Sequence, residues 1–171
     1  KDGSVVAWGG DGPALFTRLV PLGLGRLTDI AAMGNVSTLV NLGLREDGTV
    51  VMWWRSRNGF RFTLLSGYEN SIAINSGLYH YLALSEDGSV KAWGSNDYGQ
   101  CDVPAPNADY IAIAGGGVSS FGLKSDGTIV AWGHCSYSEC DAPAPNADFI
   151  AVAAAGGVIF GLKNNVPFAY R

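Results

Sequence analysis

Charged residues and long apolar runs are scarce in this sequence. Only 15% of the 171 residues are charged and 47% are hydrophobic, a composition that excludes an intrinsically disordered chain. The apolar stretch of residues 111–121 is too short to cross a bilayer and contains three glycines, so no membrane span is expected. The net charge of −4 provides no basic stripe, so nucleic acid is not an expected partner.

Signatures of processing and of catalysis are also missing. The chain begins at Lys1, without an initiator methionine or a signal peptide, so we expect a processed or truncated piece. It has no Gly-x-Ser-x-Gly, no His-Glu-x-x-His and no phosphate-binding loop. Asp102 and Asp141 are copies within a repeat and are better explained as turn residues than as an acid–base pair. The sequence therefore predicts a protein that is not an enzyme and that binds no cofactor and no metal.

Cysteine is rare, and its three copies are Cys101, Cys135 and Cys140. The odd count leaves at least one thiol unpaired within one chain. Cys135 and Cys140 flank one short loop and could form a disulfide; the alternative is that all three cysteines are reduced and structural. Cys101 and Cys140 hold equivalent positions in neighbouring repeats, which disfavours a bond between them.

One short phrase occurs four times: Asp-Gly, then Ser or Thr, then a β-branched run that ends in Trp. Its copies begin at Asp2, Asp47, Asp87 and Asp126, which gives spacings of 45, 40 and 39 residues. A period near 40 residues is typical of repeat proteins, in which each unit buries its faces against its neighbours. Asp-Gly is a turn signal first, so these aspartates do not predict a calcium site. We therefore expect residues 1–171 to form a single repeat domain, or a segment of one.

Each unit is predicted to contain several short strands. In the third unit a small-residue strand at 110–114 follows a proline loop, and a second strand contains Phe-Gly-Leu-Lys. Asp-Gly then indicates a hairpin, because these residues tolerate the positive φ of tight turns, and the third strand ends in Trp. The segment before the next proline loop predicts a fourth, outer strand. In the first two units, residues 30–34 and 72–76 fill the small-residue position.

The placement of small and large residues predicts blades arranged around an axis. Blades crowd near the axis, where Ala and Gly fit, and spread at the rim, where larger side chains are needed. Trp8, Trp53, Trp93 and Trp132 share one register and would fill the wider space, each contributing about 2–3 kcal/mol of apolar burial. The predicted fold class is an all-β β-propeller with four-stranded antiparallel blades.

Three stretches resemble the regulator-of-chromosome-condensation (RCC) repeat. They are Gly-Leu-Lys-x-Asp-Gly-Thr-Ile-Val-Ala-Trp-Gly at 122–133, Asn-Asp-Tyr-Gly-Gln at 96–100 and Gly-Leu-Tyr-His-Tyr-Leu-Ala-Leu at 77–84. The Val-Pro-Ala-Pro-Asn text at 103–107 is most similar to the bacterial branch. The resemblance implies a β-propeller, usually seven-bladed and closed by strands from both termini. The four repeats here then form part of a larger ring, or close or assemble by themselves, and residues 4–8 could complete the last blade.

The resemblance also implies protein binding. Family members act in nucleotide exchange on small GTPases, in ubiquitin-ligase and chromatin scaffolding, and in secreted β-lactamase inhibition. We therefore expect a non-catalytic protein-interaction or scaffold module whose partner is another protein. Two alternatives stay open: a structural subunit that joins chains, by self-association, through open blade edges, and a secreted β-lactamase-inhibitor-like binder. The bacterial-type repeats favour a secreted or cell-surface location.

Strand alternation sorts the loops onto two faces. The glycine turns and the loops after Trp share one face, and the Asp-Gly turns and proline loops share the other. Aromatic and arginine side chains on the first face have the composition of a protein-binding surface. The expected partner-binding residues are Arg55, Arg57, Asn58, Phe60, Tyr79, His80, Tyr98 and Tyr137. His80 has an alternative role, in which it hydrogen-bonds a neighbouring backbone carbonyl.

Overall fold

A computed structural model describes residues 5, 21, 23–33, 40–56, 59–135 and 140–164. Within these ranges the chain forms twelve β-strands, and no apolar helix of membrane-spanning length is found there. The strands are β1 (Leu27–Ala32), β2 (Val40–Arg45), β3 (Val50–Ser56), β4 (Gly59–Leu65), β5 (Ser71–Ser76), β6 (His80–Ser85), β7 (Val90–Gly94), β8 (Tyr110–Gly115), β9 (Ser119–Lys124), β10 (Ile129–Gly133), β11 (Phe149–Ala155) and β12 (Val158–Lys163).

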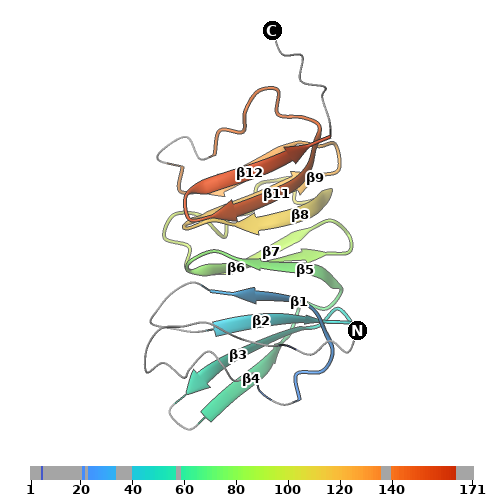
Figure 1. The fold of residues 1–171 in the computed structure, drawn as a ribbon, viewed down its shortest axis with the longest axis vertical. Coiled ribbons are helices and arrows are strands. Elements are labelled where there is room, and N and C mark those ends of the chain that lie inside the picture. The colour runs from blue at the N-terminus through green and yellow to red at the C-terminus, as the bar shows by residue number, and fades with distance from the viewer. Residues whose placement is uncertain are drawn as a thin grey trace.

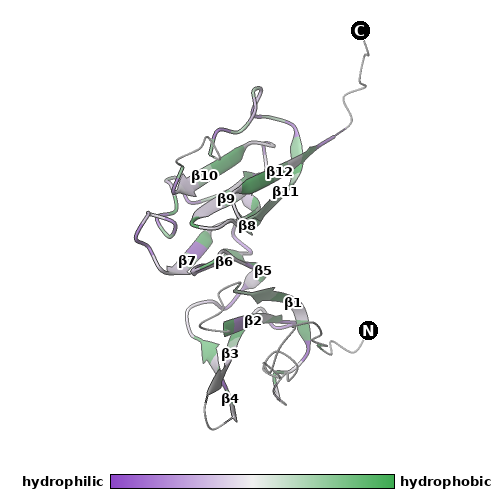
Figure 2. Ribbon diagram, turned by 60° about the vertical axis from the view of Figure 1, so that its left-hand side comes forward, coloured by the Kyte–Doolittle hydropathy of each residue, from purple (hydrophilic) through white to green (hydrophobic). Residues whose placement is uncertain are grey.

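The strands form four antiparallel sheets that follow one another as blades (Figure 1; Figure 2 shows the same order from another side). Blade 1 is β1-β2-β3-β4, blade 2 is β5-β6-β7, blade 3 is β8-β9-β10 and blade 4 is β11-β12. The small-residue strand is the innermost in each, and these strands contact one another: β1 with β5, β5 with β8, and β8 with β11. The predicted all-β fold of antiparallel blades is confirmed.

The number of strands per blade differs from the expected four, because only blade 1 has an outer strand among the described residues. In blade 2 the side chain of Asn107 takes that place: its Oδ1 accepts from the Val90 N–H at 2.7 Å, and its Nδ2 donates to the Val90 carbonyl at 2.8 Å. Asn146 pairs with Ile129 in the same way in blade 3, at 2.9 and 2.8 Å. A carboxamide presents the same donor and acceptor as a peptide group, so one side chain satisfies both backbone groups of one residue at the strand edge.

The first small-residue strand begins earlier than the expected residues 30–34. In the pairing of β1 with β2, Ile30 lies opposite Gly43. In blade 3, Ile113 lies opposite Gly122 at the same position of the sheet. Ile30 is therefore the structural counterpart of Ile113. Alignment of the sequence alone placed it two residues away, because the first unit has diverged most from the others.

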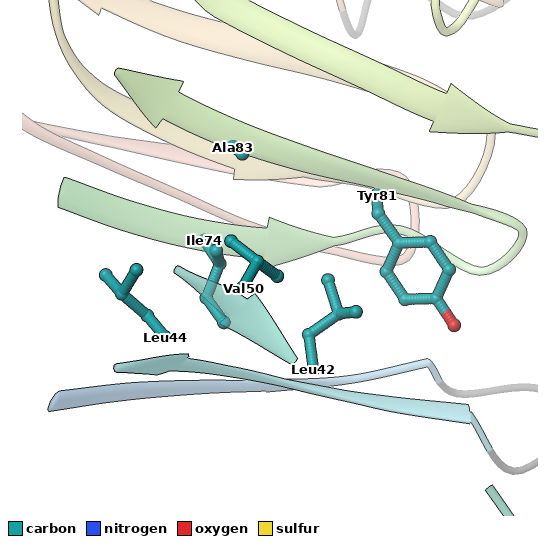
Figure 3. Packing of buried hydrophobic residues seen from close by; sticks show 6 residues of the cluster. All are labelled: Leu42, Leu44, Val50, Ile74, Tyr81 and Ala83. Atoms are coloured by element: carbon teal, nitrogen blue, oxygen red, sulfur yellow. The ribbon is translucent and has the colours of Figure 1, made fainter. Parts of the chain in front are cut away.

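The hydrophobic core lies between the blades. Figure 3 shows the first of these clusters, in which leucine and valine side chains of blade 1 point towards blade 2. Its buried members are Leu42, Leu44, Val50, Ile74, Tyr81 and Ala83. Similar clusters fill the spaces between blades 2 and 3 and between blades 3 and 4. Each blade is therefore stabilised by the blades that adjoin it, as expected for a repeat protein.

Backbone hydrogen bonds at the Asp-Gly turns also join each blade to the next. In every case the glycine carbonyl accepts the N–H of the first residue in the following small-residue strand. The pairs are Gly48–Ser71, Gly88–Tyr110 and Gly127–Phe149, with distances of 3.1, 3.0 and 3.0 Å. Gly127 has a φ of 81°, and a Cβ at this position would lie 2.9 Å from the backbone nitrogen of Asp148. Both the backbone conformation and the close approach therefore require glycine.

Candidate protein-binding face

The glycine turns and the loops that follow Trp93 and Trp132 lie on one side of the blades, as strand alternation predicts. We call this side the loop face; its described parts are residues 77–79, 95–102, 116–118, 134–135 and 156–157. The N–H of Ser95 donates to the Tyr79 carbonyl at 2.9 Å, and the N–H of His134 donates to the Val118 carbonyl at 3.0 Å. Each loop after Trp is therefore fastened to the glycine turn of its own blade.

The glycine turns of successive blades are also fastened to one another. The N–H of Leu78 donates to the Gly117 carbonyl at 3.0 Å, and the N–H of Gly117 donates to the Gly156 carbonyl at 2.7 Å. The blades approach so closely here that a Cβ at Gly115 would lie 2.4 Å from the carbonyl carbon of Ser76. The turns of blades 2, 3 and 4 thus form a fixed row.

The loop of residues 95–102 is held in shape by its own side chains. Asn96 Oδ1 accepts from the Cys101 N–H at 2.7 Å, while Asn96 Nδ2 donates to Asp102 Oδ1 at 2.8 Å. Gln100 Oε1 accepts from the Tyr98 N–H at 2.9 Å. These bonds explain the Asn-Asp-Tyr-Gly-Gln motif, in which the amide side chains close the loop and the tyrosine is left outside.

Two tyrosines project from this rigid frame. Tyr79 is 45% exposed and Tyr98 is 54% exposed. The Tyr98 ring meets the His134 ring edge-on, with centroids 4.9 Å apart and an interplanar angle of 79°. Tyrosines on a fixed backbone offer large amphipathic contact area at a low cost in conformational entropy, which is why they are common at protein interfaces.

Leu78 is a member of this face that sequence reasoning missed. Its side chain is partly exposed beside Tyr79, at the tip of the turn between β5 and β6. Its backbone takes part in the row of turns, since it bonds to Gly117. The signal was present in the repeat, because blade 3 has a glycine in the matching turn where blade 2 has this leucine.

His80 lies beneath the face and is completely buried. Its Nε2 is 2.8 Å from Ser120 Oγ, and that hydroxyl donates to the Gln100 carbonyl at 2.8 Å. Because the serine hydrogen is used in this way, the imidazole must donate from Nε2. Burial lowers the pKa of His80 to about 4. Trp132 Nε1 donates to the same Gln100 carbonyl at 3.0 Å, so the network joins blades 2 and 3.

The other expected binding residues are placed differently. Phe60 is half-buried and packs against a cluster in blade 1 that contains Leu24 and Trp53. Arg55 lies in β3, where its backbone pairs with that of Phe60. Three expected residues fall outside the described ones: Arg57, Asn58 and Tyr137. Of the expected set, the two tyrosines of blade 2 are the ones described as exposed on the loop face.

A disulfide joins Cys135 and Cys140, whose Cα atoms are 5.3 Å apart. The disulfide links the two ends of a short loop that follows Trp132. Of the two alternatives that the sequence left open, the structure therefore has the Cys135–Cys140 disulfide and not three reduced cysteines. The remaining cysteine, Cys101, has a half-buried free thiol that lies 3.3 Å from the Ser95 carbonyl. Burial, and to a lesser extent the charge of Asp102, raises the pKa of this thiol. It is therefore protonated at neutral pH and a poor nucleophile.

The opposite face carries the Asp-Gly turns. The carboxylate Oδ1 of each aspartate accepts from both the N–H and the hydroxyl of the residue two positions later, at 2.6 to 3.0 Å. The aspartates are Asp47, Asp87 and Asp126. The hydroxyl hydrogen bond is the main reason that the pKa of each carboxyl is lowered. One carboxylate oxygen of each is used by the turn, and the described residues contain no cluster of three metal-ligating side chains.

Comparisons with known proteins agree with this architecture. Residues 72–100 match the regulator of chromosome condensation (RCC1) repeat. No curated protein sequence matches the chain. Similar solved structures include human WBSCR16 (16% identity, TM-score 0.64, covering 87% of this chain and 48% of that one). The ectodomain of the Physcomitrella patens receptor kinase CR4 is 17% identical, with a TM-score of 0.64, and the match covers 85% of this chain and 40% of that one. Yeast RCC1 (Prp20), crystallised with Kap60, is 19% identical, with a TM-score of 0.61, and the match covers 81% of this chain and 42% of that one.

These identities are low, so the structural likeness shows the fold alone, and the chain spans less than half the length of each of these three structures. The repeat match covers most of blade 2, including β5, β6 and β7, the loop of residues 95–100 and both tyrosines. The predicted resemblance is therefore confirmed, and this chain carries an RCC1 repeat within blades of the RCC1 β-propeller type.

Proposed function

We propose that this chain is a non-catalytic protein-interaction module that binds a partner protein on the loop face. The observation that carries the proposal is the pair Tyr79 and Tyr98, both about half exposed and both held on hydrogen-bonded loops. A rigid aromatic pair can contact a partner without first losing conformational freedom. RCC1-type propellers commonly bind other proteins, and yeast RCC1 (Prp20) has been crystallised bound to Kap60.

The electrostatic character of the chain narrows the partner class. The net charge of −4 repels nucleic acid and favours a partner surface that is neutral or basic. The partner is therefore expected to be a protein with an apolar or cationic patch that fits around the tyrosine rings, since aromatic faces also attract arginine and lysine.

The test is a comparison of matched variants as bait. A Tyr79→Ala/Tyr98→Ala double variant should lose at least 10-fold in affinity for any partner that wild type captures, because buried interface tyrosines are typical hot spots. Ile111→Ala is the matched control, since this side chain is equally exposed but lies on a small-residue strand. Equal affinity of wild type and the double variant for every captured partner would exclude this face.

The two alternatives relate to this proposal in different ways. Inhibition of a β-lactamase would be one case of protein binding, and adding wild type or the double variant to the enzyme tests it directly: an unchanged hydrolysis rate at micromolar protein removes it. Assembly of chains through blade edges concerns blade 4 rather than the loop face, so the two roles do not compete.

A further inference from the structure

Blade 4 exposes a sheet face that is buried in every other blade. Phe160 and Leu162 of β12 are 63% and 60% exposed. In blade 3 the same two positions of the sheet are held by Phe121 and Leu123, which are 1% and 0% exposed, because blade 4 covers them. Figure 2 shows β12 in the green of hydrophobic residues at the end of the stack. The repeat itself therefore indicates what should cover this face, namely another blade of the same type.

Blade 1 exposes the complementary half of such an interface. Ile74 of β5 packs on Leu42 and Leu44 of the preceding blade, as Figure 3 shows. Ile30 occupies the same position in β1, because it lies opposite Gly43 as Ile74 lies opposite the corresponding residue of β6. Ile30 is 56% exposed, whereas Ile74 is buried. The two ends of the stack thus carry the two halves of one blade–blade contact.

A cavity between blades 3 and 4 lies where a tryptophan lies between blades 2 and 3. Between blades 2 and 3, Trp132 fills the space beside Ala92 and Val103 and lies against Gly122. Between blades 3 and 4 the matching place is a cavity of about 280 Å³. Its wall includes the counterparts of the residues around Trp132: Ala131, Ala142, Phe149 and Gly161. Among the described residues, β12 pairs with β11 alone, so the strand that would supply this tryptophan is missing.

The sequence contains one copy of the tryptophan phrase that the described blades do not use. Residues 2–8, which lie outside the described ones apart from Val5, read Asp-Gly-Ser-Val-Val-Ala-Trp. In chain order this phrase precedes β1, just as the phrase at 126–132 precedes β11. A chain whose residues 2–8 joined β12 of a neighbour would therefore bring its own blade 1 onto the exposed face of that neighbour's blade 4.

We propose that a second copy of this chain docks head to tail on blade 4. Its residues 2–8 add the third strand beside β12, its Trp8 enters the cavity, and its Ile30 packs on Phe160 and Leu162. The contact joins unlike surfaces, so it closes into a ring if the rotation permits.

The first test is the mass of the chain in solution by light scattering. Wild type should give the mass of two chains, and a Phe160→Asp/Leu162→Asp variant should give that of one chain, 17.9 kDa. Both side chains are exposed in the single copy, so the variant should retain its β-sheet circular dichroism. Ile111→Asp is the control: it introduces an aspartate at a similarly exposed position within blade 3, adding one negative charge where the double variant adds two, and should leave the doubled mass unchanged.

Mixing experiments then distinguish a head-to-tail contact from a symmetric one. Ile30→Asp damages one end of the stack and Phe160→Asp/Leu162→Asp damages the other, so each variant alone should be monomeric. A mixture of the two keeps one intact contact, so it should form pairs, but only at higher protein concentration than the wild-type ring needs. In a Cys101→Ser background, mixed Ile30→Cys and Leu162→Cys chains should form an intermolecular disulfide, and neither should do so alone.

Three results would overturn the proposal. The first is a strict monomer for wild type at every concentration, which includes the case in which residues 2–8 close blade 4 of their own chain. The second is a dimer whose mass survives the Phe160→Asp/Leu162→Asp substitutions. The third is a disulfide formed by Leu162→Cys chains alone, which would show that two copies of blade 4 meet face to face. None of these results bears on the loop face and its tyrosines.

Discussion

Acid should destabilise this protein through one buried imidazole. Burial lowers the pKa of His80 from its ordinary 6.5 to about 4. The unfolded chain therefore binds more protons between these two values, so the free energy of unfolding is highest above pH 6.5 and decreases as the pH falls towards 4. The lowered pKa corresponds to a loss of about 2.5 kcal/mol between pH 8 and pH 4.5. Urea unfolding followed by tryptophan fluorescence across this pH range measures it.

The control for this prediction is His80→Gln. The glutamine amide can still donate to Ser120 but does not titrate, so the variant should show a shallower loss of stability in the same pH window. The carboxyls of the Asp-Gly turns do not interfere, because their pKa values are lowered and they titrate below this window. Identical pH dependence in wild type and variant would refute the assignment of a buried neutral imidazole.

Three further substitutions test the contacts between blades, each read as a change in the free energy of unfolding in urea. Gly127→Ala should cost about 1–3 kcal/mol, because the new Cβ meets Asp148 and the φ is positive; an unchanged midpoint would contradict the close approach. Asn146→Leu should cost about 2 kcal/mol, because it leaves both backbone groups of Ile129 unpaired; Asn146→Asp would recover part of the loss if the acceptor matters most. Phe121→Ala should cost about 3–5 kcal/mol, because it leaves a cavity where a buried ring was removed; a loss below 1 kcal/mol would show that blade 4 does not cover the Phe121 side chain.

The hairpins of this fold could be predicted from the sequence because their determinants are local. Asp87 accepts hydrogen bonds from Ser89, two residues away, and the turn that they form connects β6 to β7. The same phrase at 47 and 126 connects β2 to β3 and β9 to β10. Such a turn signal lies within a few consecutive residues, so it can be recognised without knowledge of the tertiary structure. The repeat count and the strand order could be predicted from it.

Features that depend on partners far along the chain were not predictable in the same way. Asn107 reaches a strand 17 residues earlier, and nothing in a Pro-Ala-Pro-Asn sequence distinguishes an amide that completes a sheet from an outer strand that does so. Lys124 is a second example: its Nζ donates to two carbonyls of the proline loop and lies 4.2 Å from the Tyr110 ring centroid. Both side chains anchor the proline loop between β7 and β8: Asn107 ties it to blade 2, and Lys124 ties it to blade 3.

The candidate site shows the same division. Tyr79 and Tyr98 could be selected as exposed aromatics because they stand in turns between strands. His80 belongs to the same short stretch of sequence, yet it is buried, because it begins β6, which is buried along its whole length, and it contacts the Ser120 hydroxyl of the next blade. The difference between Tyr79 and its neighbour depends on the distance between two blades, which a single repeat does not encode.

In the proposed assembly, the energetics of blade 4 favour a closed two-copy ring over an open chain of copies. Burying Phe160 and Leu162 would stabilise a contact by about 2–3 kcal/mol each, and a tryptophan in the cavity by about as much again. Association costs between roughly 4 and 15 kcal/mol in lost translational and rotational freedom, so a single contact of this size gives only weak binding. Ring closure by two copies adds a second identical contact without a second loss of that freedom. A head-to-tail pair that closes should therefore be much more stable than one that stays open.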